Sequence, residues 1–342
     1  MPVTIRDVAA ASRVSIGTVS RALNDYPDVS TATRERVRSV VRELGYMPNQ
    51  TAQSLSSKHA KGISLIISGF LEDKVFNDFD TMLMRGAFQF ATERGIPLSL
   101  NVINSEQQTE KNFEQLCFEH NSSGAILFGL KTDDPYCESL CTSSFPCVTV
   151  DVEVPGEKVG CVRLDDRRAA FEMTERLFDL GHRRVAVVHG SRNAVVSRER
   201  FLGIQDACRV RGLEISLDDV VYTNFTHEDA YLRVGNYLDR HSSGEGVTAF
   251  ICMSDLLALG TIQAIQARGL SVPQDFSVTG YDGISLTSFV TPQITTVDQN
   301  VQLKGYEAAH LLYDMLNGER PAQTIVLPHT IRMRGSVRKI SR

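Results

Sequence analysis

The N-terminal segment decides the fold, and its residues 4–24 read TIRDVAAASRVSIGTVSRALN. Thr4 followed three positions later by Asp7 is typical of a helix N-cap, where the positive end of the helix dipole also favours an acid. Apolar side chains then recur at helical spacing, which predicts a helix over residues 5–12. After a tight turn, Ser15 is expected to cap a second helix with a buried stripe of Val19, Ala22 and Leu23. Two short helices joined in this way predict a helix-turn-helix.

The second helix presents residues that can approach base edges and phosphates: Ile16, Gly17, Thr18, Ser20 and Arg21. A third helix is expected from a cap near Ser30 to about Leu44. Its inward side chains would be Val37, Val40, Val41 and Leu44, and its outward ones Arg34, Arg38 and Arg42. Periodicity alone leaves two interpretations open, a nucleic-acid-binding module and a small helical bundle with a solvated basic face.

Charge is divided unevenly along the chain. The whole sequence carries −5, but residues 1–61 hold nine Lys/Arg against five Asp/Glu, a net +4 that leaves about −9 for the remainder. A basic module attached to an acidic body can neutralise DNA phosphates locally. The negative total therefore does not exclude nucleic-acid binding.

Composition limits the class of protein. A chain of 342 residues with 42% hydrophobic and 23% charged residues is expected to form more than one globular domain. Apolar runs such as 63–70 are too short to span a bilayer, and the N-terminus resembles no secretory signal. Seven scattered Cys indicate reduced thiols in the cytoplasm, with no disulfide framework or metal cluster. No cofactor is expected.

Beyond Lys61 the pattern changes to strand-length apolar runs that alternate with amphipathic helical stretches. Strands are expected at 62–68, 97–102, 124–128, 147–150, 184–189, 249–253 and 277–281. Helices are expected near 79–94, 106–119, 167–180, 199–211, 227–240, 255–268 and 300–317. This alternation predicts parallel, doubly wound α/β sheets, and the number of elements is enough for two.

The first 60 residues resemble the headpiece of the LacI/GalR family of bacterial transcriptional regulators. The resemblance rests on TIRDVA at 4–9, TVSRALN at 18–24, TRERV at 33–37 and LGYMPN at 44–49. It implies major-groove contacts from Ile16, Gly17 and Arg21, with further DNA contacts from Thr4, Ser15, Thr18, Ser20, Asn24 and Thr33. Arg13 stands where the family often has glycine, which implies either a left-handed backbone or a phosphate contact.

The same resemblance implies a hinge helix from Asn49 to about Ser56. In the family this helix orders on the operator and wedges a leucine into the minor groove. Leu55 occupies that position here, with Ala52 on the same face. Such a wedge kinks DNA at a cost of roughly a few kcal/mol, offset by additional contacts.

The body resembles a periplasmic sugar-binding protein, with two subdomains around a ligand cleft. The match includes LGHRR at 180–184, RFLG at 200–203, SDLLALG at 254–260 and GYD at 280–282. The implied organisation is a headpiece at 1–47, a hinge helix and linker at 48–61, and an effector-binding and dimerisation domain at 62–342. Within the last, the expected subdomains are about 62–161 plus 292–320, and about 162–291 plus 321–340.

The ligand contacts implied by the resemblance are Phe79, Asp80, Asp151, Arg200, Phe225, Ser254 and Asp282. Guanidinium donors, carboxylate acceptors and a flat apolar ring together suit a polyol. Other roles stay open for three of them: Asp282 as a helix cap, Arg200 as a surface ion pair, and Phe225 as core. An acid after Phe79, where the family commonly has an aromatic pair, favours a hydroxyl-rich ligand over a planar base.

The sequence is therefore predicted to encode a regulator, most simply a repressor, that binds a pseudo-palindromic double-stranded operator as a homodimer. Its affinity would be controlled by a sugar or sugar derivative; the alternative is a nucleoside, purine or phosphorylated metabolite acting as co-repressor. Enzyme motifs such as GxSxG, GxxxxGK[ST], HExxH and CxxC are absent. No leucine heptad follows the last expected strand, which favours a dimer over a tetramer.

Overall fold

The computed structural model describes residues 3–23, 26, 28–44, 62–68, 78–241 and 246–340. The chain divides into two compact units, Met1–Ala60 and Lys61–Arg342, and each is described by itself. The predicted hinge and linker, residues 48–61, lie outside the described residues.

The N-terminal unit contains the three predicted helices, α1 (Ile5–Ser12), α2 (Ile16–Leu23) and α3 (Thr31–Leu44). Their facing sides meet in a small core in which Val8, Val19, Ala22 and Val37 are fully buried. The helix-turn-helix is thus confirmed. One expectation is wrong: Leu44 is exposed, because the core ends one turn earlier, at Val40 and Val41.

Local hydrogen bonds explain where these helices begin and end. Thr4 donates from its backbone N and its Oγ1 to Asp7 Oδ2, at 2.7 Å each. Ser15 Oγ accepts from the backbone N of Thr18 at 3.1 Å and starts α2. Between these helices Arg13 has φ 55°, the left-handed conformation expected where its family relatives carry glycine.

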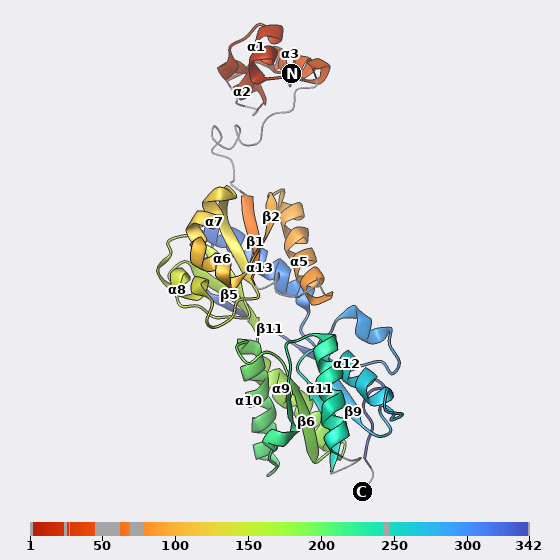
Figure 1. Ribbon diagram of the computed structural model, residues 1–342. Helices are drawn as coiled ribbons and strands as arrows, with labels where there is room; N and C mark the ends of the chain where they lie inside the picture. The colour runs from red at the N-terminus through yellow and green to blue at the C-terminus, as the bar shows by residue number, and fades with distance from the viewer. Residues whose placement is uncertain are drawn as a thin grey trace. The chain divides into compact units, whose positions relative to one another are not determined.

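The second unit holds two six-stranded sheets (Figure 1). The first has the order β11-β5-β4-β3-β1-β2 and is parallel throughout: β1 (Gly62–Ser68), β2 (Leu98–Ile103), β3 (Ser122–Phe128), β4 (Cys147–Val150), β5 (Val159–Leu164) and β11 (Thr324–Leu327). The second has the order β12-β10-β9-β8-β6-β7: β6 (Arg184–His189), β7 (Val220–Tyr222), β8 (Val247–Cys252), β9 (Ser277–Asp282), β10 (Thr295–Asp298) and β12 (Thr330–Arg332). Only β12, paired with β10, runs antiparallel.

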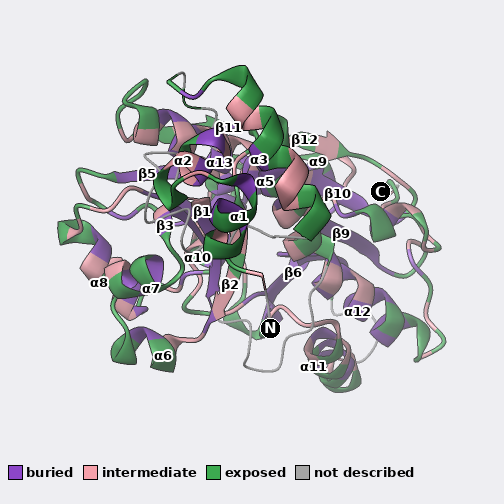
Figure 2. Ribbon diagram, turned by 90° about the horizontal axis from the view of Figure 1, so that it is seen from above, coloured by how far each residue is buried: buried purple, intermediate pink, exposed green. Residues whose placement is uncertain are grey.

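Helices cover both sheets, so the strands are largely buried while the helices keep exposed outer faces (Figure 2). The first sheet carries α5 (Asp78–Arg94), α6 (Ser105–Glu110), α7 (Phe113–Glu119), α8 (Pro135–Thr142) and α13 (Val301–Asn317). The second carries α9 (Asp166–Asp179), α10 (Val195–Val210), α11 (His227–Arg240) and α12 (Asp255–Gln266), with the short 3-10 helices η1 (Leu217–Asp219) and η2 (Ser285–Ser288). We call these two assemblies the first and second lobe.

Helices α5 and α13 pack unusually closely in the first lobe. A Cβ at Gly86 would lie 1.9 Å from the backbone O of Gln302, and one at Gly305 would lie 2.0 Å from the backbone O of Leu83. Glycine at both positions lets the two backbones approach. This contact holds α13 against α5 in the first lobe, which the chain enters directly after β10.

Sheet membership corrects the expected subdomain boundaries. Residues 292–320 were assigned by resemblance to the first subdomain, but β10 pairs with β9 in the second sheet. Residues 321–340 were assigned to the second, but β11 pairs with β5 in the first sheet. The chain therefore crosses after Leu164, Asp298 and Leu327, a few residues later than predicted each time. The pattern missed β10, whose sequence TTVD is polar at both ends, and β11, a short and largely unburied edge strand.

Most other predicted elements lie within a few residues of their expected positions. The helix expected near 106–119 is two helices, α6 and α7, because Asn104 and Asn112 each cap a separate start. Strands β5, β7 and β12 and helix α8 were not predicted. Among the described residues, none of the helices has both the length and the apolar character required to cross a membrane.

Candidate functional site

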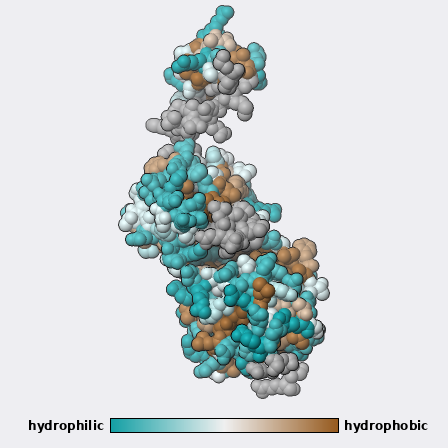
Figure 3. Space-filling model, viewed as in Figure 1, coloured by the Kyte–Doolittle hydropathy of each residue, from teal (hydrophilic) through white to brown (hydrophobic). Residues whose placement is uncertain are grey.

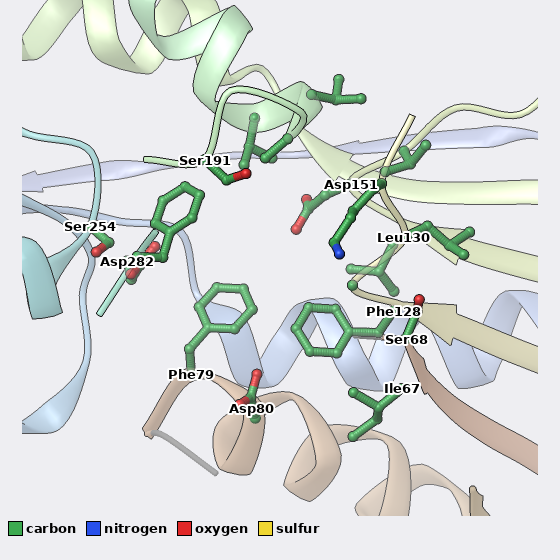
Figure 4. Close-up of a pocket in the computed structure, with 18 of the residues that line it drawn as sticks. Ile67, Ser68, Phe79, Asp80, Phe128, Leu130, Asp151, Ser191, Ser254 and Asp282 are labelled. Carbon is green, nitrogen blue, oxygen red and sulfur yellow. The ribbon is translucent and has the colours of Figure 1, made fainter. Parts of the chain in front are cut away.

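Seven side chains predicted to contact a ligand all line one cavity of about 230 Å³ in the second unit. Figure 4 labels Phe79, Asp80, Asp151, Ser254 and Asp282 among them. The first lobe contributes Phe79, Asp80 and Asp151, and the second contributes Arg200, Phe225, Ser254 and Asp282. Residues far apart in sequence thus converge from both lobes. Their convergence is a property of the fold.

The carboxyl ends of parallel strands explain this convergence. Asp151 follows β4, Ser254 follows β8, and Asp282 ends β9. Ligands of doubly wound proteins bind outside such strand ends. Asp151 and Asp282 have φ values of 64° and 120°, sparsely populated backbone regions for residues other than glycine. Strain of this kind is typical of positions where the fold must direct a side chain into a site.

Aromatic rings form the apolar part of the cavity wall. Phe79 and Phe128 stack with ring centroids 5.6 Å apart and an interplanar angle of 26° (Figure 4). Phe225 packs against Gly190, where a Cβ would lie 2.1 Å from the ring. Phe225 is therefore both packed against its own lobe and exposed to the cavity, so neither interpretation of its role excludes the other.

Arg200 is a buried residue and not a surface ion pair. Its side chain is 4% exposed, and Nε donates to Asp166 Oδ1 at 2.7 Å. Nη1 donates to the backbone O of Met253 and lies 3.7 Å from Asp282 Oδ1. The guanidinium carbon also lies 3.7 Å from the ring centroid of Tyr281. Neighbouring Arg198 forms the exposed pair, with Glu199.

Asp282 is not the N-cap of the helix that follows it, since Ile284 holds that position in η2. Its Oδ1 accepts a hydrogen bond from Gln299 Nε2 at 2.8 Å. Burial raises the pKa of Asp282 to about 7, although Arg200 and Gln299 favour its ionised form. Burial likewise raises the pKa of Asp151, opposed by the Lys304 ammonium. Both carboxyls are thus poised to respond to a new hydrogen-bond donor.

Ser254 has a structural role as well as its place in the cavity wall. Its Oγ accepts from the backbone N of Leu257 at 3.2 Å and caps α12. The next residue, Asp255, accepts from the backbone N of Gly283 and of Ile284 and from Thr296 Oγ1. Asp255 therefore holds the loop after β9 in place, which positions Asp282.

Sequence reasoning missed several residues of the wall. Phe128 and Ser191 line the cavity, as does Lys131. Phe128 is the last residue of a predicted apolar strand, and its place at a strand's carboxyl end was the signal that could have identified it. Ser191 and Lys131 lie in loops and carry no pattern of their own.

A second cavity of about 490 Å³ adjoins the first and shares four of its wall residues, Asp151, Val152, Val195 and Val196. Two of its other wall residues form an ion pair, with Arg163 Nε 3.1 Å from Glu153 Oε1. The space around Asp151 therefore extends beyond the first cavity.

Helix α2 provides the candidate nucleic-acid interface of the headpiece. Ile16 is 45% exposed although it is apolar, and Gly17 and Arg21 are exposed beside it. Thr18 and Ser20 are half-buried, and Thr4 and Ser15 are exposed. A Cβ at Gly17 would have only Ser15 Oγ within 4 Å, at 3.7 Å, so the protein itself does not require glycine there.

Other predicted DNA contacts either have a partner within the headpiece or lie outside the described residues. Arg21 pairs with Asp28 within the headpiece. Thr33 Oγ1 lies 2.9 Å from Ser30 Oγ, and this pair marks the start of α3. Arg34, expected to point outward, donates instead to the backbone O of Tyr26 and of Val29. Asn24, Asn49, Ala52 and Leu55 lie outside the described residues.

Two protein-family models match the chain. "Bacterial regulatory proteins, lacI family" matches residues 4–49, the helix-turn-helix unit. "Periplasmic binding protein-like domain" matches residues 174–337, which include most of the second lobe together with α13 and β11 of the first.

Curated relatives match nearly the full length. The HTH-type transcriptional regulator CelR of Thermobifida fusca is 32% identical, with 95% of this chain and 96% of the relative covered. Catabolite control protein A of Priestia megaterium is 32% identical, with 99% and 100% covered.

Solved structures show the same architecture. A CelR–cellobiose complex matches with a TM-score of 0.74 and 31% identity, covering 98% of this chain and 99% of that one. The Lac repressor dimer bound to operator and the anti-inducer ONPF matches with a TM-score of 0.85, at 24% identity and 99% and 100% coverage, and shows the fold alone. On the full-length identity and the headpiece match, the chain belongs to the LacI family of bacterial DNA-binding transcriptional regulators.

Proposed function

We propose that this regulator is a cytoplasmic repressor whose operator affinity is controlled by a neutral carbohydrate. The observation that carries the proposal is the cavity, where buried carboxylates and a buried guanidinium converge from two lobes beside aromatic rings. Carboxylates accept from sugar hydroxyls, the guanidinium donates to them, and the rings pack against the apolar faces of a pyranose.

The charge of the wall argues against an anionic effector. Among the described residues of the wall, the ionisable ones are three carboxylates and two cations: Asp80, Asp151, Asp282, Lys131 and Arg200. Arg200 is already paired with Asp166, which is also buried. A phosphate brought into this space would meet Asp80, Asp151 and Asp282. Asp151 is directly paired with Lys304, but like-charge repulsion from the three carboxylates would still weaken phosphate binding. A phosphorylated metabolite is therefore disfavoured.

A nucleoside is the second candidate, and one observation favours it. The stacked pair of Phe79 and Phe128 offers a flat apolar surface on which a planar base could lie. The polar groups opposite that surface, Asp151 and Asp282, are acceptors when ionised and suit hydroxyls better than the acceptor edge of a base. We therefore place the carbohydrate first.

The adjoining cavity supports a ligand longer than one ring. It shares Asp151 and Val152 with the first cavity and is lined by further polar side chains. The related CelR was solved with the disaccharide cellobiose. A disaccharide is thus the preferred size for the effector of this chain.

Exposed apolar side chains support a homodimer. Phe289 is 81% exposed and Leu286 41% exposed in the second lobe, and Phe88 on α5 and Leu100 on edge strand β2 are each 39% exposed in the first. Figure 3 shows apolar atoms gathered at the surface of both lobes. Two-fold pairing through such surfaces would match a pseudo-palindromic operator.

A ligand screen tests the effector class. The full-length protein is heated with neutral mono- and disaccharides including cellobiose, with sugar phosphates, and with nucleosides. A ligand that binds only the folded state raises the melting temperature. We expect stabilisation by a neutral carbohydrate that is lost in Asp282→Asn, with Arg209→Ala, which removes an exposed arginine outside both cavities, as the control. Stabilisation by a nucleoside or a sugar phosphate alone would contradict the proposal.

A further inference from the structure

Two carboxylates of the cavity, one from each lobe, are joined by a continuous chain of side chains. Lys304 Nζ lies 2.7 Å from Asp151 Oδ1 and also donates to Gln299 Oε1. The amide of Gln299 then donates from Nε2 to Asp282 Oδ1 at 2.8 Å. The order Asp151–Lys304–Gln299–Asp282 therefore links the end of β4 in the first lobe to the end of β9 in the second.

Lys304 is fully buried, which is rare for lysine. Its side chain is 0% exposed, and it lies on the buried face of α13 between two apolar residues of that face, Val301 and Ala308. A buried ammonium costs free energy unless it is paired and hydrogen-bonded. An apolar side chain would be buried at this position at a lower cost in free energy. The lysine is therefore better explained by the two side chains that it contacts, Asp151 and Gln299.

The link lies on a segment that passes between the lobes. Gln299 follows directly after β10 of the second sheet, and Lys304 lies in the first turns of α13, which packs in the first lobe. Gln299 is itself fully buried. The backbone N of Gln299 also donates to the backbone O of Asp282, at 3.3 Å. A change in the angle between the lobes would therefore strain this short run of hydrogen bonds.

We propose that Lys304 is a positioning residue for effector binding, which it serves by pairing with Asp151 and holding it, through Gln299, at a defined spacing from Asp282. This inference rests on the proposed effector site. It adds the contacts that couple ligand binding at that site to the relative arrangement of the two lobes. A ligand whose hydroxyls bridge both carboxylates fits only one spacing. A ligand bound in the cavity then favours one arrangement of the two lobes, because Lys304 and Gln299 connect the two carboxylates.

A first experiment measures the lobes without any ligand. Fluorophores are placed by unnatural amino acids at two exposed positions, Glu138 on α8 and Arg240 at the end of α11, and energy transfer reports the distance between the lobes. We expect Lys304→Met and Gln299→Leu each to shift or broaden this distance in the full-length protein. Lys111→Met, which removes an exposed lysine paired with Glu119, is the matched control and should change nothing.

A second experiment measures binding of cellobiose and the other neutral sugars of the screen by calorimetry. Lys304→Met should weaken binding roughly tenfold to a hundredfold, the range expected when a charge-assisted hydrogen bond is lost or misplaced. Lys304→Arg should recover part of the affinity because it restores a cation beside Asp151. A lysine with a merely structural role would lower thermal stability without this recovery of binding.

Folding of the variants is controlled by the double variant Asp151→Asn/Lys304→Met, since removing both members of a buried pair costs less than removing one. If that protein folds and the energy-transfer distance still equals the wild-type value, the inference is overturned. Unchanged distance and sugar affinity in Lys304→Met would overturn it as well. If the wild-type protein binds no neutral sugar, the proposed function fails, while the energy-transfer measurement still decides whether the link holds the lobes.

Discussion

Arg200 Nη1 lies 3.7 Å from Asp282 Oδ1, while Nε of the same guanidinium donates to Asp166 at 2.7 Å. Arg200 is thus shared between a structural partner and a carboxylate of the cavity wall. Because all three side chains are buried, loss of the arginine would leave two carboxyls without their cation.

Arg200→Ala is therefore expected to affect both ligand response and stability. Removing one member of a buried ionic cluster costs about 3–5 kcal/mol, so the free energy of unfolding should fall by that order. Arg198→Ala, which breaks an exposed pair, should cost less than about 1 kcal/mol. Denaturant titration of both variants measures the difference, and equal stabilities would contradict the buried network.

Effector affinity should depend on pH around neutrality. Burial raises the pKa of Asp282 to about 7, so a growing fraction of the free protein is protonated there below pH 7. A ligand hydroxyl that donates to the carboxylate favours the ionised form, so binding releases a proton and weakens by up to roughly tenfold per pH unit below 7. Calorimetry in buffers of different ionisation enthalpy detects that proton. Asp282→Asn should bind weakly at every pH, and a wild-type affinity constant from pH 6 to 8 would count against this role.

Gly17 offers a test of the DNA interface that is separate from folding. A Cβ there meets only Ser15 Oγ at 3.7 Å, and alanine is roughly 1 kcal/mol better than glycine within a helix. Gly17→Ala should therefore preserve or raise headpiece stability. If α2 enters the major groove with this residue against DNA, operator affinity should nevertheless fall. Fluorescence anisotropy on an operator selected from random double-stranded DNA measures this, and unchanged affinity would remove Gly17 from the interface.

Phe289 tests the proposed dimer. It is 81% exposed, so Phe289→Asp should not disturb the core of the second lobe. If it lies in a two-fold interface, the charge should shift the protein toward monomer in light scattering. Leu217→Asp, at a position 78% exposed on η1, is the matched control and should leave the mass unchanged. A dimer that survives Phe289→Asp would place the interface elsewhere.

The sequence predicted the elements better than their assignment to lobes. The expected strands at 147–150 and 184–189 match β4 and β6 at both ends, because a buried parallel strand carries a mostly apolar run. The strand TTVD at 295–298 is short and polar at both ends, so only its pairing with β9 reveals its sheet. The lobe boundaries were misplaced for this reason.

The candidate site shows the same division. Resemblance to a family predicted seven residues that converge on one cavity, and Asp151, Ser254 and Asp282 do so because they lie at the carboxyl ends of parallel strands. Lys304 was not predicted, since it lies within an amphipathic helix where lysine normally faces solvent. Its place at the i+3 position of the stripe that begins at Val301 was the available signal. Which carboxylate it meets depends on β4, which no local pattern connects to α13.

The central claim is that a neutral carbohydrate bound in this cavity controls operator affinity. The most direct measurement is the affinity of the full-length protein for its selected operator, by fluorescence anisotropy, with and without the sugar that stabilises it most in the thermal screen. We predict a change in operator affinity of at least tenfold that disappears in Asp282→Asn, while that variant still binds the operator. An operator affinity that no neutral carbohydrate alters, but that a nucleoside or a phosphorylated metabolite does, would contradict the account.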